Sequence, residues 1–295
     1  MDIGGSVRGG AGVYRWRVID THCHLTFPDF AGRVDEVLAD AATAGVSGAI
    51  SISTTTLDCL DALRVAEAHE RVWCTAGVHP LYSDVGDERA AGRAGSVHVW
   101  ENLRRVASHA KCVAWGELGL DNHYPKPARE VQRAVLDEQL AFIERVNHGG
   151  ADGIGKAGGL PVVIHCREAF DDLIPVLRRT GLRPERFVFH CFTGNAGEIR
   201  KVLDFGAWVS FTGVLTYPNA PELREAARLV PDDRVMVETD APFLPPVPHR
   251  GKRPCMPGWV ALTARALAEV RGVAFERLHE QVNRNTAAFF GIEAR

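Results

Sequence analysis

The sequence predicts an α/β fold, a (β/α)8 TIM barrel with slight elaborations, and three observations support this prediction. Short apolar runs recur along the chain, most of them are nearly continuous in hydrophobicity, and helical patterns fill the gaps between them. Parallel strands that are buried on both faces carry runs of this kind. Eight such units within about 225 residues favour a barrel over a doubly wound open sheet, the main competitor. The runs are Arg17–Thr21, Gly48–Ser53, Val72–Gly77, Cys112–Gly116, Pro161–His165, Phe187–His190, Ala207–Phe211 and Val235–Thr239.

The segments between the runs have the spacing of amphipathic helices. Apolar residues recur every three or four positions in 136–143 and again in 260–270. Asn195 with Glu198 three residues later resembles a capping box, which marks the start of a helix. Phe275–Phe290 reads as an additional C-terminal helix packed on the outside of the barrel.

Composition and charge limit the number of domains and the kinds of molecule that the protein can bind. The chain has 295 residues, of which 46% are hydrophobic and 24% charged, enough for one large core. We therefore expect a single hydrolase domain over 16–295, after a flexible glycine-rich tail at 1–15. The net charge of −3 gives no global attraction for nucleic acid. The positive charge that binds phosphate must then come from a local cluster of basic residues or from metal ions.

Seven cysteines in irregular spacing do not form a disulfide framework and suit a reducing compartment. No apolar run reaches the roughly 18 residues of a membrane span, and no signal peptide is recognisable. We expect a cytoplasmic protein that does not bind membranes. Cys23, Cys166 and Cys191 each adjoin a histidine, and we expect them to face the helices as small buried hydrophobic residues.

The segment 147–160 before the fifth strand contains six glycines. Within it, Gly153–Gly158 matches the dinucleotide-binding pattern G-x-G-x-x-G. That pattern requires a strand before it and a helix after it. Here the order is helix, loop and strand, so the segment is predicted to be a flexible surface insertion.

Side chains that can bind metal gather at the predicted carboxyl ends of the strands, where the active sites of such barrels lie. His22 and His24 are two residues apart, so on a strand their imidazoles point the same way. Chance would place one or two such residues at this end of the barrel, but six of them lie there on five strands. The six are His22, His24, Glu117, His165, His190 and Asp240.

These ligand types indicate a two-metal site. Imidazole with carboxylate suits zinc, manganese, iron or cobalt, and suits magnesium less well. Four histidines and two carboxylates are too many for one ion, but they suit two ions about 3.5–4 Å apart that share a carboxylate. Glu117 is the natural bridge, because its strand lies between the two groups of histidines.

Seven short motifs lie in order between residues 19 and 253: Ile19–His24, Gly77–Pro80, Gly116–Asp121, Ile164–Arg167, Phe189–Gly194, Glu238–Leu244 and Arg250–Arg253. Through these motifs the chain resembles the TatD family of metal-dependent deoxyribonucleases, within the amidohydrolase-like barrels. The resemblance implies a metal role for the same six residues, two divalent ions (Zn, Mg or Mn) and a nucleic acid substrate. It also implies that DNA is the substrate, with 3'-5' exonuclease-like cleavage.

The hypothesis for the mechanism gives Glu117 and Asp240 catalytic roles. One ion would lie on His22, His24, Glu117 and Asp240, and the other on Glu117, His165 and His190. The ions would acidify a water molecule, and Asp240 would accept its proton as general base.

Further residues near the predicted mouth are candidates for substrate contact. Phe192 and Tyr217 could stack on a base, although core packing is the default for both. Asp121 and Asn122 could orient the ligands. The candidates for phosphate binding are His79, Arg167, Arg250, Lys252 and Arg253.

Other functions use the same residues differently. One alternative is amide or ring hydrolysis, as in the wider amidohydrolase superfamily. Many of those enzymes bridge two metals with a modified lysine on strand four, where this chain has Glu117. Hydrolysis of aminoacyl-tRNA or of a small ester is a related alternative. A metal-storing protein or an inherited scaffold is disfavoured because the general base Asp240 is present. We expect a monomer without an obligate protein partner.

Overall fold

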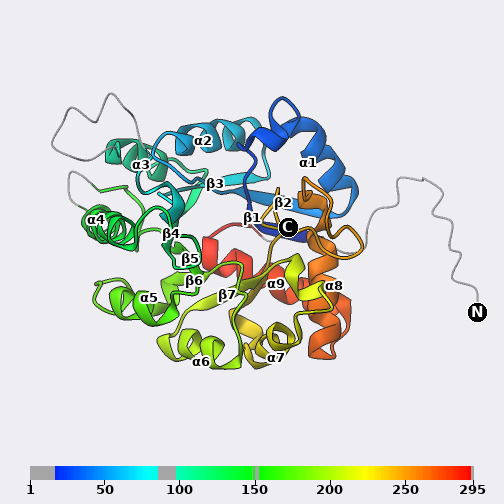
Figure 1. Ribbon diagram of the computed structural model, residues 1–295. Helices are drawn as coiled ribbons and strands as arrows, with labels where there is room; N and C mark the ends of the chain where they lie inside the picture. The colour runs from blue at the N-terminus through cyan, green and yellow to red at the C-terminus, as the bar shows by residue number, and fades with distance from the viewer. Residues whose placement is uncertain (1–16, 86–97, 148, 150–152, 294–295) are drawn as a thin grey trace, which may run out of the picture.

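The computed structural model describes residues 17–85, 98–147, 149 and 153–293, so the predicted tail at 1–15 lies outside the described residues. Eight strands form one parallel sheet in sequence order, with helices around it (Figure 1). The strands are β1 (Val18–Cys23), β2 (Val46–Ser51), β3 (Val72–Ala76), β4 (Cys112–Asp121), β5 (Val162–Arg167), β6 (Phe187–Phe189), β7 (Trp208–Phe211) and β8 (Val235–Val237). The helices include α1 (Val34–Thr43), α2 (Asp58–Ala68), α3 (Trp100–Ala107), α4 (Arg129–Asn147), α5 (Phe170–Leu177), α6 (Ala196–Phe205), α7 (Pro221–Leu229), α8 (Val260–Arg271) and α9 (Phe275–Phe290).

The sheet closes on itself at the carboxyl ends of β1 and β8. The backbone N–H of Asp240 donates to the carbonyl of His22 over 2.9 Å, and that of His24 donates to the carbonyl of Ala241 over 2.7 Å. The buried carboxylate of Asp20 accepts hydrogen bonds from the backbone and the hydroxyl of Thr239, over 2.9 and 2.6 Å. The predicted barrel is therefore confirmed, and the open sheet is wrong. Closure also places the histidines of β1 beside Asp240.

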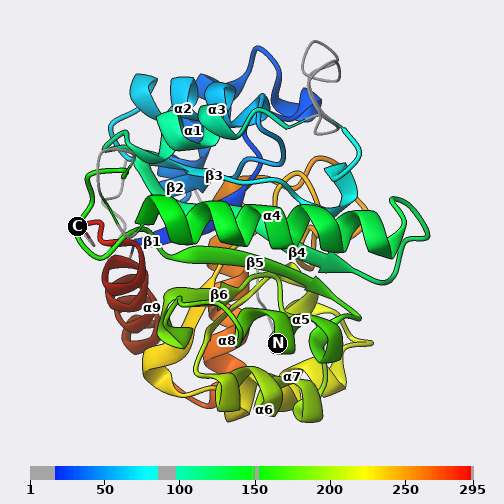
Figure 2. The same cartoon turned by 90° about the vertical axis from the view of Figure 1, so that its left-hand side faces the viewer.

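Helix α9 covers the amino-terminal end of the barrel (Figure 2). The Asn283 side chain accepts from the N–H of Ile19 and donates to Arg17, at the start of β1. Phe289 and Phe290 then join the cluster of buried residues inside the barrel. The predicted helix at 275–290 is confirmed, but it closes the amino-terminal end of the barrel instead of packing around the outside, because Phe289 and Phe290 pack against residues of the strands.

We expect Phe289→Ala to destabilise the fold. The Phe289 ring is 4% exposed and packs against Trp208 in a T-shaped arrangement, with ring centroids 5.4 Å apart. Removing a buried phenyl ring costs about 3–5 kcal/mol. The free energy of unfolding in urea measures the loss. Leu229→Ala, at a side chain that is 38% exposed, is the control, and equal losses in the two variants would contradict this role for α9.

Two local predictions concern the ends of helices and the glycine-rich segment. The capping box of Asn195 and Glu198 is present at the start of α6.

In the described part of the glycine-rich segment, Ile154 is buried, and the Lys156 ammonium donates to the carbonyls of His109 and Cys112. This part packs against the barrel and does not lie free on its surface. Strand β5 follows it, which fits the rejection of a dinucleotide site.

None of the helices in the described part of the chain combines the length and the hydrophobicity that a membrane crossing requires.

Candidate metal centre

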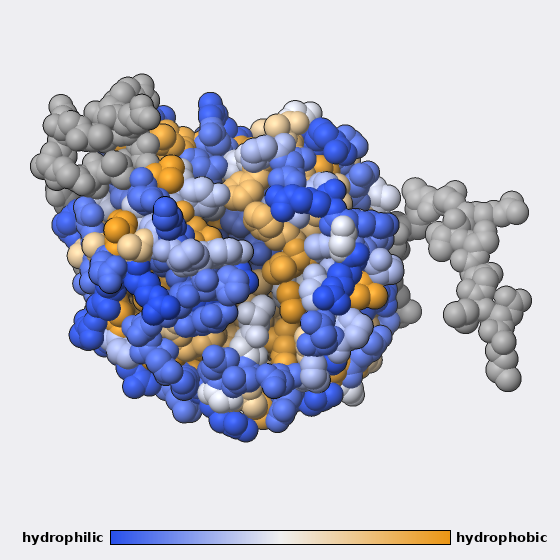
Figure 3. Space-filling model, in the orientation of Figure 1, coloured by the Kyte–Doolittle hydropathy of each residue, from blue (hydrophilic) through white to orange (hydrophobic). Residues whose placement is uncertain are grey.

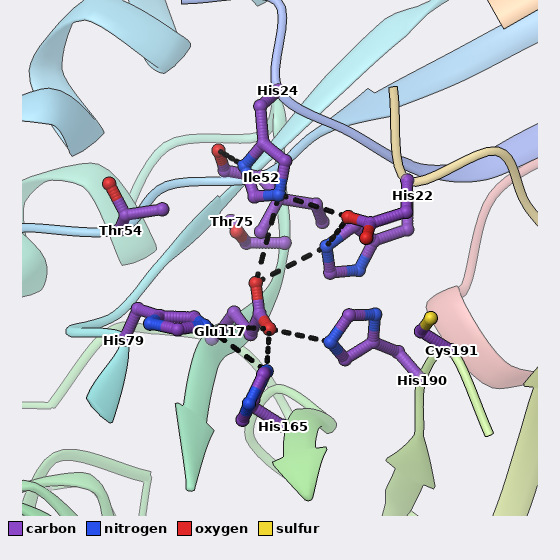
Figure 4. A network of polar contacts seen from close by, with 12 residues as sticks. His22, His24, Ile52, Thr54, Thr75, His79, Glu117, His165, His190 and Cys191 are labelled. Atoms are coloured by element: carbon purple, nitrogen blue, oxygen red, sulfur yellow. Dashed lines mark hydrogen bonds and ion pairs between the residues drawn. The ribbon is translucent and has the colours of Figure 1, made fainter. Parts of the chain in front are cut away.

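The carboxylate of Glu117 lies at the centre of the site and is 1% exposed (Figure 4). One of its oxygens, Oε1, faces three imidazoles. It lies 2.5 Å from His190 Nε2, 2.8 Å from His165 Nδ1 and 3.4 Å from His79 Nε2. Two of these three histidines were predicted as metal ligands, and the third, His79, as a phosphate contact.

The other oxygen of Glu117 faces the histidines of β1. Oε2 lies 3.3 Å from His22 Nε2 and 3.9 Å from His24 Nε2. Asp240 Oδ1 lies 3.7 and 3.3 Å from the same two nitrogens. The spacing of His22 and His24 therefore brings both rings to one place, as the strand geometry predicts. Glu117 stands between the two groups of histidines.

The local shape of β4 aims Glu117 into the barrel. The register between β4 and β5 shifts between Trp115 and Leu118, where β4 has one extra residue. Such a bulge redirects a side chain. Nearby, Gly119 has a φ of 153°, and a Cβ there would lie 1.8 Å from the carbonyl oxygen of His165. Only glycine permits this close approach of β4 to β5.

The charges in the cluster support one another. Burial by itself would raise the pKa of Glu117, but the neighbouring imidazoles, that of His190 above all, hold this pKa well below its usual value. Burial also opposes a charge on His190, yet the carboxylates of Glu117 and Glu238 raise the pKa of this ring well above its ordinary value. Burial lowers the pKa of His79 to about 3, so this ring is neutral.

Two further carboxylates orient the histidines from behind. Asp121 Oδ2 lies 3.0 Å from His165 Nε2, in the role that the sequence predicted for it. Glu238 Oε1 lies 3.1 Å from His190 Nδ1 and also accepts the N–H of Cys191. Asn122, in contrast, donates to Glu168 and Asp172 on the rim, away from the ligands.

Sequence reasoning missed the role of Glu238. The available signal was an acidic residue at the end of a buried apolar strand, two positions before Asp240. A carboxylate in such a place needs a buried partner.

The residues present fit a metal centre. Both ring nitrogens of His22 are buried and make no well-aligned hydrogen bond to any residue that the structure describes, although Nε2 faces Glu117 Oε2 at 3.3 Å. A buried polar atom left without a partner costs about 1–3 kcal/mol, and a cation bound at Nε2 would satisfy it. Within the described ranges, three groups have ligand atoms within 4.8 Å of one another: His22, Glu117 and His190; His22, His24 and Asp240; and His79, Glu117 and His165.

A cavity of about 730 Å³ opens above the cluster at the carboxyl end of the barrel. Figure 3 shows a hollow at the centre of this face, where apolar and polar surfaces meet. All the predicted ligands except the fully buried His22 line the cavity, together with His79 and Arg167. Arg250, Lys252 and Arg253 lie on the exposed loop after β8 and are not part of its lining.

Several side chains near the cavity differ from their predicted places. Cys23 is buried in the core, as expected, but Cys166 and Cys191 are partly exposed and line the cavity. Phe192 is 2% exposed and packs in the core, so it cannot stack on a base. Tyr217 lies outside the lining, under the guanidinium of Arg250.

Comparison with known proteins places the chain in a family. The sequence profile described as TatD related DNase matches residues 19–291. The protein named "Uncharacterized metal-dependent hydrolase YcfH" of Escherichia coli K12 is 36% identical over 280 residues, 94% of this chain and 97% of the relative. The 3'-5' ssDNA/RNA exonuclease TatD of Pantoea ananatis is 34% identical over 280 residues, 93% of this chain and 100% of the relative.

Solved structures agree with this placement. YjjV, a TatD homologue from Escherichia coli K12, matches with a TM-score of 0.79 and 30% identity, over 94% of this chain and 99% of that chain. A TatD family hydrolase from Entamoeba histolytica has the same fold, with a TM-score of 0.79 at 20% identity over 93% of this chain and 98% of that one. The chain belongs to the family of TatD-related DNases.

Proposed function

We propose that this protein is a metal-dependent hydrolase that cleaves phosphodiester bonds in DNA, from a 3' end, at a site with two divalent ions. The observation that carries the proposal is the position of Glu117. Its two oxygens face two separate groups of histidines, 2.5–2.8 Å from His165 and His190 and 3.3 Å from His22. A carboxylate so placed suits the bridge between two ions.

Each ion would have its own set of ligands. His22, His24 and Asp240 would hold one ion and His165 and His190 the other, with Glu117 shared. Zinc and manganese suit these donors, and magnesium suits them less well. The carboxylates of Asp121 and Glu238 would hold the rings of His165 and His190 in place, which is the usual way in which a metal-binding imidazole is oriented.

Bound ions of this kind supply an acidified water and neutralise charge on phosphate oxygens. Asp240 accepts the proton in our proposal. Burial opposes its charge, but the hydrogen bond from His24 and the nearby His22 hold its pKa below the usual value, so it is ionised and ready to accept. It also lines the cavity, where a substrate would lie.

His79 is suited to donate a hydrogen bond to the phosphate. Its Nδ1 accepts the backbone N–H of Leu81 over 3.0 Å, so the proton of the neutral ring is on Nε2. That N–H lies 3.1 Å from His165 Nδ1 and 3.4 Å from Glu117 Oε1, in the lining of the cavity. A nitrogen that carries a proton cannot bind a metal ion, which favours the phosphate role for His79 over a third metal position.

The exposed basic side chains of the loop after β8 would contact the part of the nucleic acid that lies outside the cavity. Arg250 covers Tyr217, and Arg253 forms a two-pronged ion pair with Asp29 and covers Phe243. Arg250 and Lys252 therefore place positive charge beside the mouth, where flanking phosphates of a nucleic acid would run, whereas Asp29 offsets the charge of Arg253. Arg167 lines the cavity itself.

Amide or small-ester hydrolysis is less well supported. In our proposal the residue of β4 that bridges the two ions is the unmodified carboxylate Glu117, and not the modified lysine that many amide-hydrolysing enzymes have on this strand. Relatives named as exonucleases of single-stranded DNA and RNA match over nearly the whole chain. We further propose that the protein works as a monomer in the reducing cytoplasm, which its seven free cysteines would suit.

Metal removal tests the function. We expect purified protein to contain up to two divalent ions and to shorten end-labelled single-stranded DNA from its 3' end in Mn²⁺ or Mg²⁺. Dialysis against a chelator should lower the rate at least a hundredfold, and added metal should restore it, because the acidified water requires the ions. Bovine serum albumin taken through the same dialysis controls for free metal. Cleavage that survives chelation, or no cleavage of any nucleic acid, would refute the proposal.

A further inference from the structure

One exposed aromatic side chain at the mouth of the cavity is unexplained by the chemistry above. Tyr124 follows β4, is 45% exposed and lines the cavity. The proposed metal centre does not use this side chain, and a ring so exposed contributes little to the core. An aromatic ring left open at a substrate site is a usual means of stacking on a nucleobase.

The position of Tyr124 is fixed relative to the metal centre by Asp121. One oxygen of this buried carboxylate, Oδ1, accepts the backbone N–H groups of His123 and Tyr124 over 2.9 and 3.0 Å. The other oxygen, Oδ2, lies 3.0 Å from His165 Nε2. A single carboxylate therefore holds both a proposed ligand and the turn that presents the ring.

A cation accompanies the ring. The guanidinium of Arg167 lies 5.1 Å from the centroid of Tyr124. Arg167 is the last residue of β5 and pairs in register with Asp121 on β4. It forms no ion pair with a carboxylate of the described residues, so its charge is available to a phosphate. An aromatic face next to an unpaired cation matches the base and the phosphate of one nucleotide.

Two other aromatic side chains that line the cavity, Phe27 and Phe243, already pack against neighbouring side chains. Phe27 stacks on His24 with ring centroids 4.6 Å apart and meets Phe243 in a T-shaped arrangement. Arg253 covers Phe243 and is tied to Asp29. These rings support a proposed ligand, whereas Tyr124 is the more exposed ring and meets only the edge of an exposed imidazole among the described rings, that of His123, with centroids 4.9 Å apart.

We propose that Tyr124 stacks on a nucleobase next to the scissile phosphate, and that Arg167 contacts the phosphate of the same nucleotide. This inference rests on the proposed function and names the feature of the substrate that the site selects. A base must leave a duplex to stack on a side chain, so Tyr124 selects single-stranded ends. Tyr124 is a specificity-determining residue and does not take part in the chemical step.

The test compares two substrates. One is a single-stranded oligonucleotide with natural bases, and the other is the same chain with abasic residues on both sides of the scissile phosphate. We expect Tyr124→Ala to lower kcat/KM on the natural chain about tenfold, the effect of one base–aromatic stack, and on the abasic chain less than twofold. Tyr124→Phe should keep the wild-type value, because stacking needs only the ring.

A control is Val131→Ala, which truncates an apolar side chain of similar exposure (39%) on α4, outside the cavity lining. It should behave as wild type on both substrates. An equal loss on the natural and abasic chains in Tyr124→Ala would overturn the stack, because it would show a structural role. Wild-type protein that binds the natural chain more tightly than the abasic chain but cleaves neither would support the stack and refute the proposed nuclease activity.

Discussion

Asp240→Asn should lower kcat on single-stranded DNA by about 10²–10⁴-fold, the range that general bases contribute. The variant keeps the shape of the side chain but cannot accept the proton of water. It also keeps the backbone, because residue 240 has a φ of 58°, a left-handed conformation that asparagine tolerates almost alone among the other side chains. Alanine at this position would confuse loss of the base with backbone strain.

Metal content separates the two roles of Asp240. The ion on His165 and His190 does not depend on Asp240, so at least one ion should remain in the variant. Rates and bound metal are measured on the same preparation. The control is Asp137→Asn on α4, an exposed carboxylate paired with Arg133, which should change neither quantity. Activity within tenfold of wild type would refute the role of Asp240 as base.

The sequence predicted the barrel and its cluster because both follow from simple periodicities. Parallel strands buried on two faces require continuous apolar runs, and every strand of a closed barrel delivers its carboxyl end to the same face. Because His22, His165 and Asp240 each lie at the carboxyl end of an apolar run, they could be predicted to lie at one site without any knowledge of contacts between strands.

Features that depend on a local irregularity were harder to predict. Strand β4 was expected to end at Gly116 but runs on to Asp121, past the bulge that turns Glu117 inward. Cys166 and Cys191 were assigned to the outer face by strict alternation. Alternation does not apply where a strand ends, and Cys191 follows β6 with a φ of 44°.

Contacts between residues that are far apart in the chain could not be predicted from the sequence, for a different reason. Glu238 orients His190 across 48 positions of the chain, and Tyr124 meets Arg167 across two strand ends. Neither pair leaves a local pattern, because the contact exists only after the barrel has closed. Such residues are found from burial and geometry, so the proposal of a base stack on Tyr124 depends on the folded structure.

Glu117→Ala should remove at least one metal ion and lower activity at least a thousandfold. In the wild type, two oxygens of one buried carboxylate face four proposed ligand histidines. Without it the imidazoles lose the negative charge that offsets bound cations in a site closed to water, where unbalanced charge is costly. Metal analysis of the purified variant gives the stoichiometry, and two ions per chain would refute the bridge.

The same change should alter the stability that metal provides. A ligand that binds only the folded state raises the free energy of unfolding by about 2.7 kcal/mol at a hundredfold excess over its Kd. Wild-type protein should gain this amount when metal is added, and Glu117→Ala should gain much less at the same concentration. Glu117→Gln keeps the shape without the charge, so it separates packing from charge: if charge is the cause, it should fail as alanine does. Glu130→Ala, at an exposed residue of α4, should retain the full gain, and a full gain in Glu117→Ala would show that the carboxylate does not bind the ions.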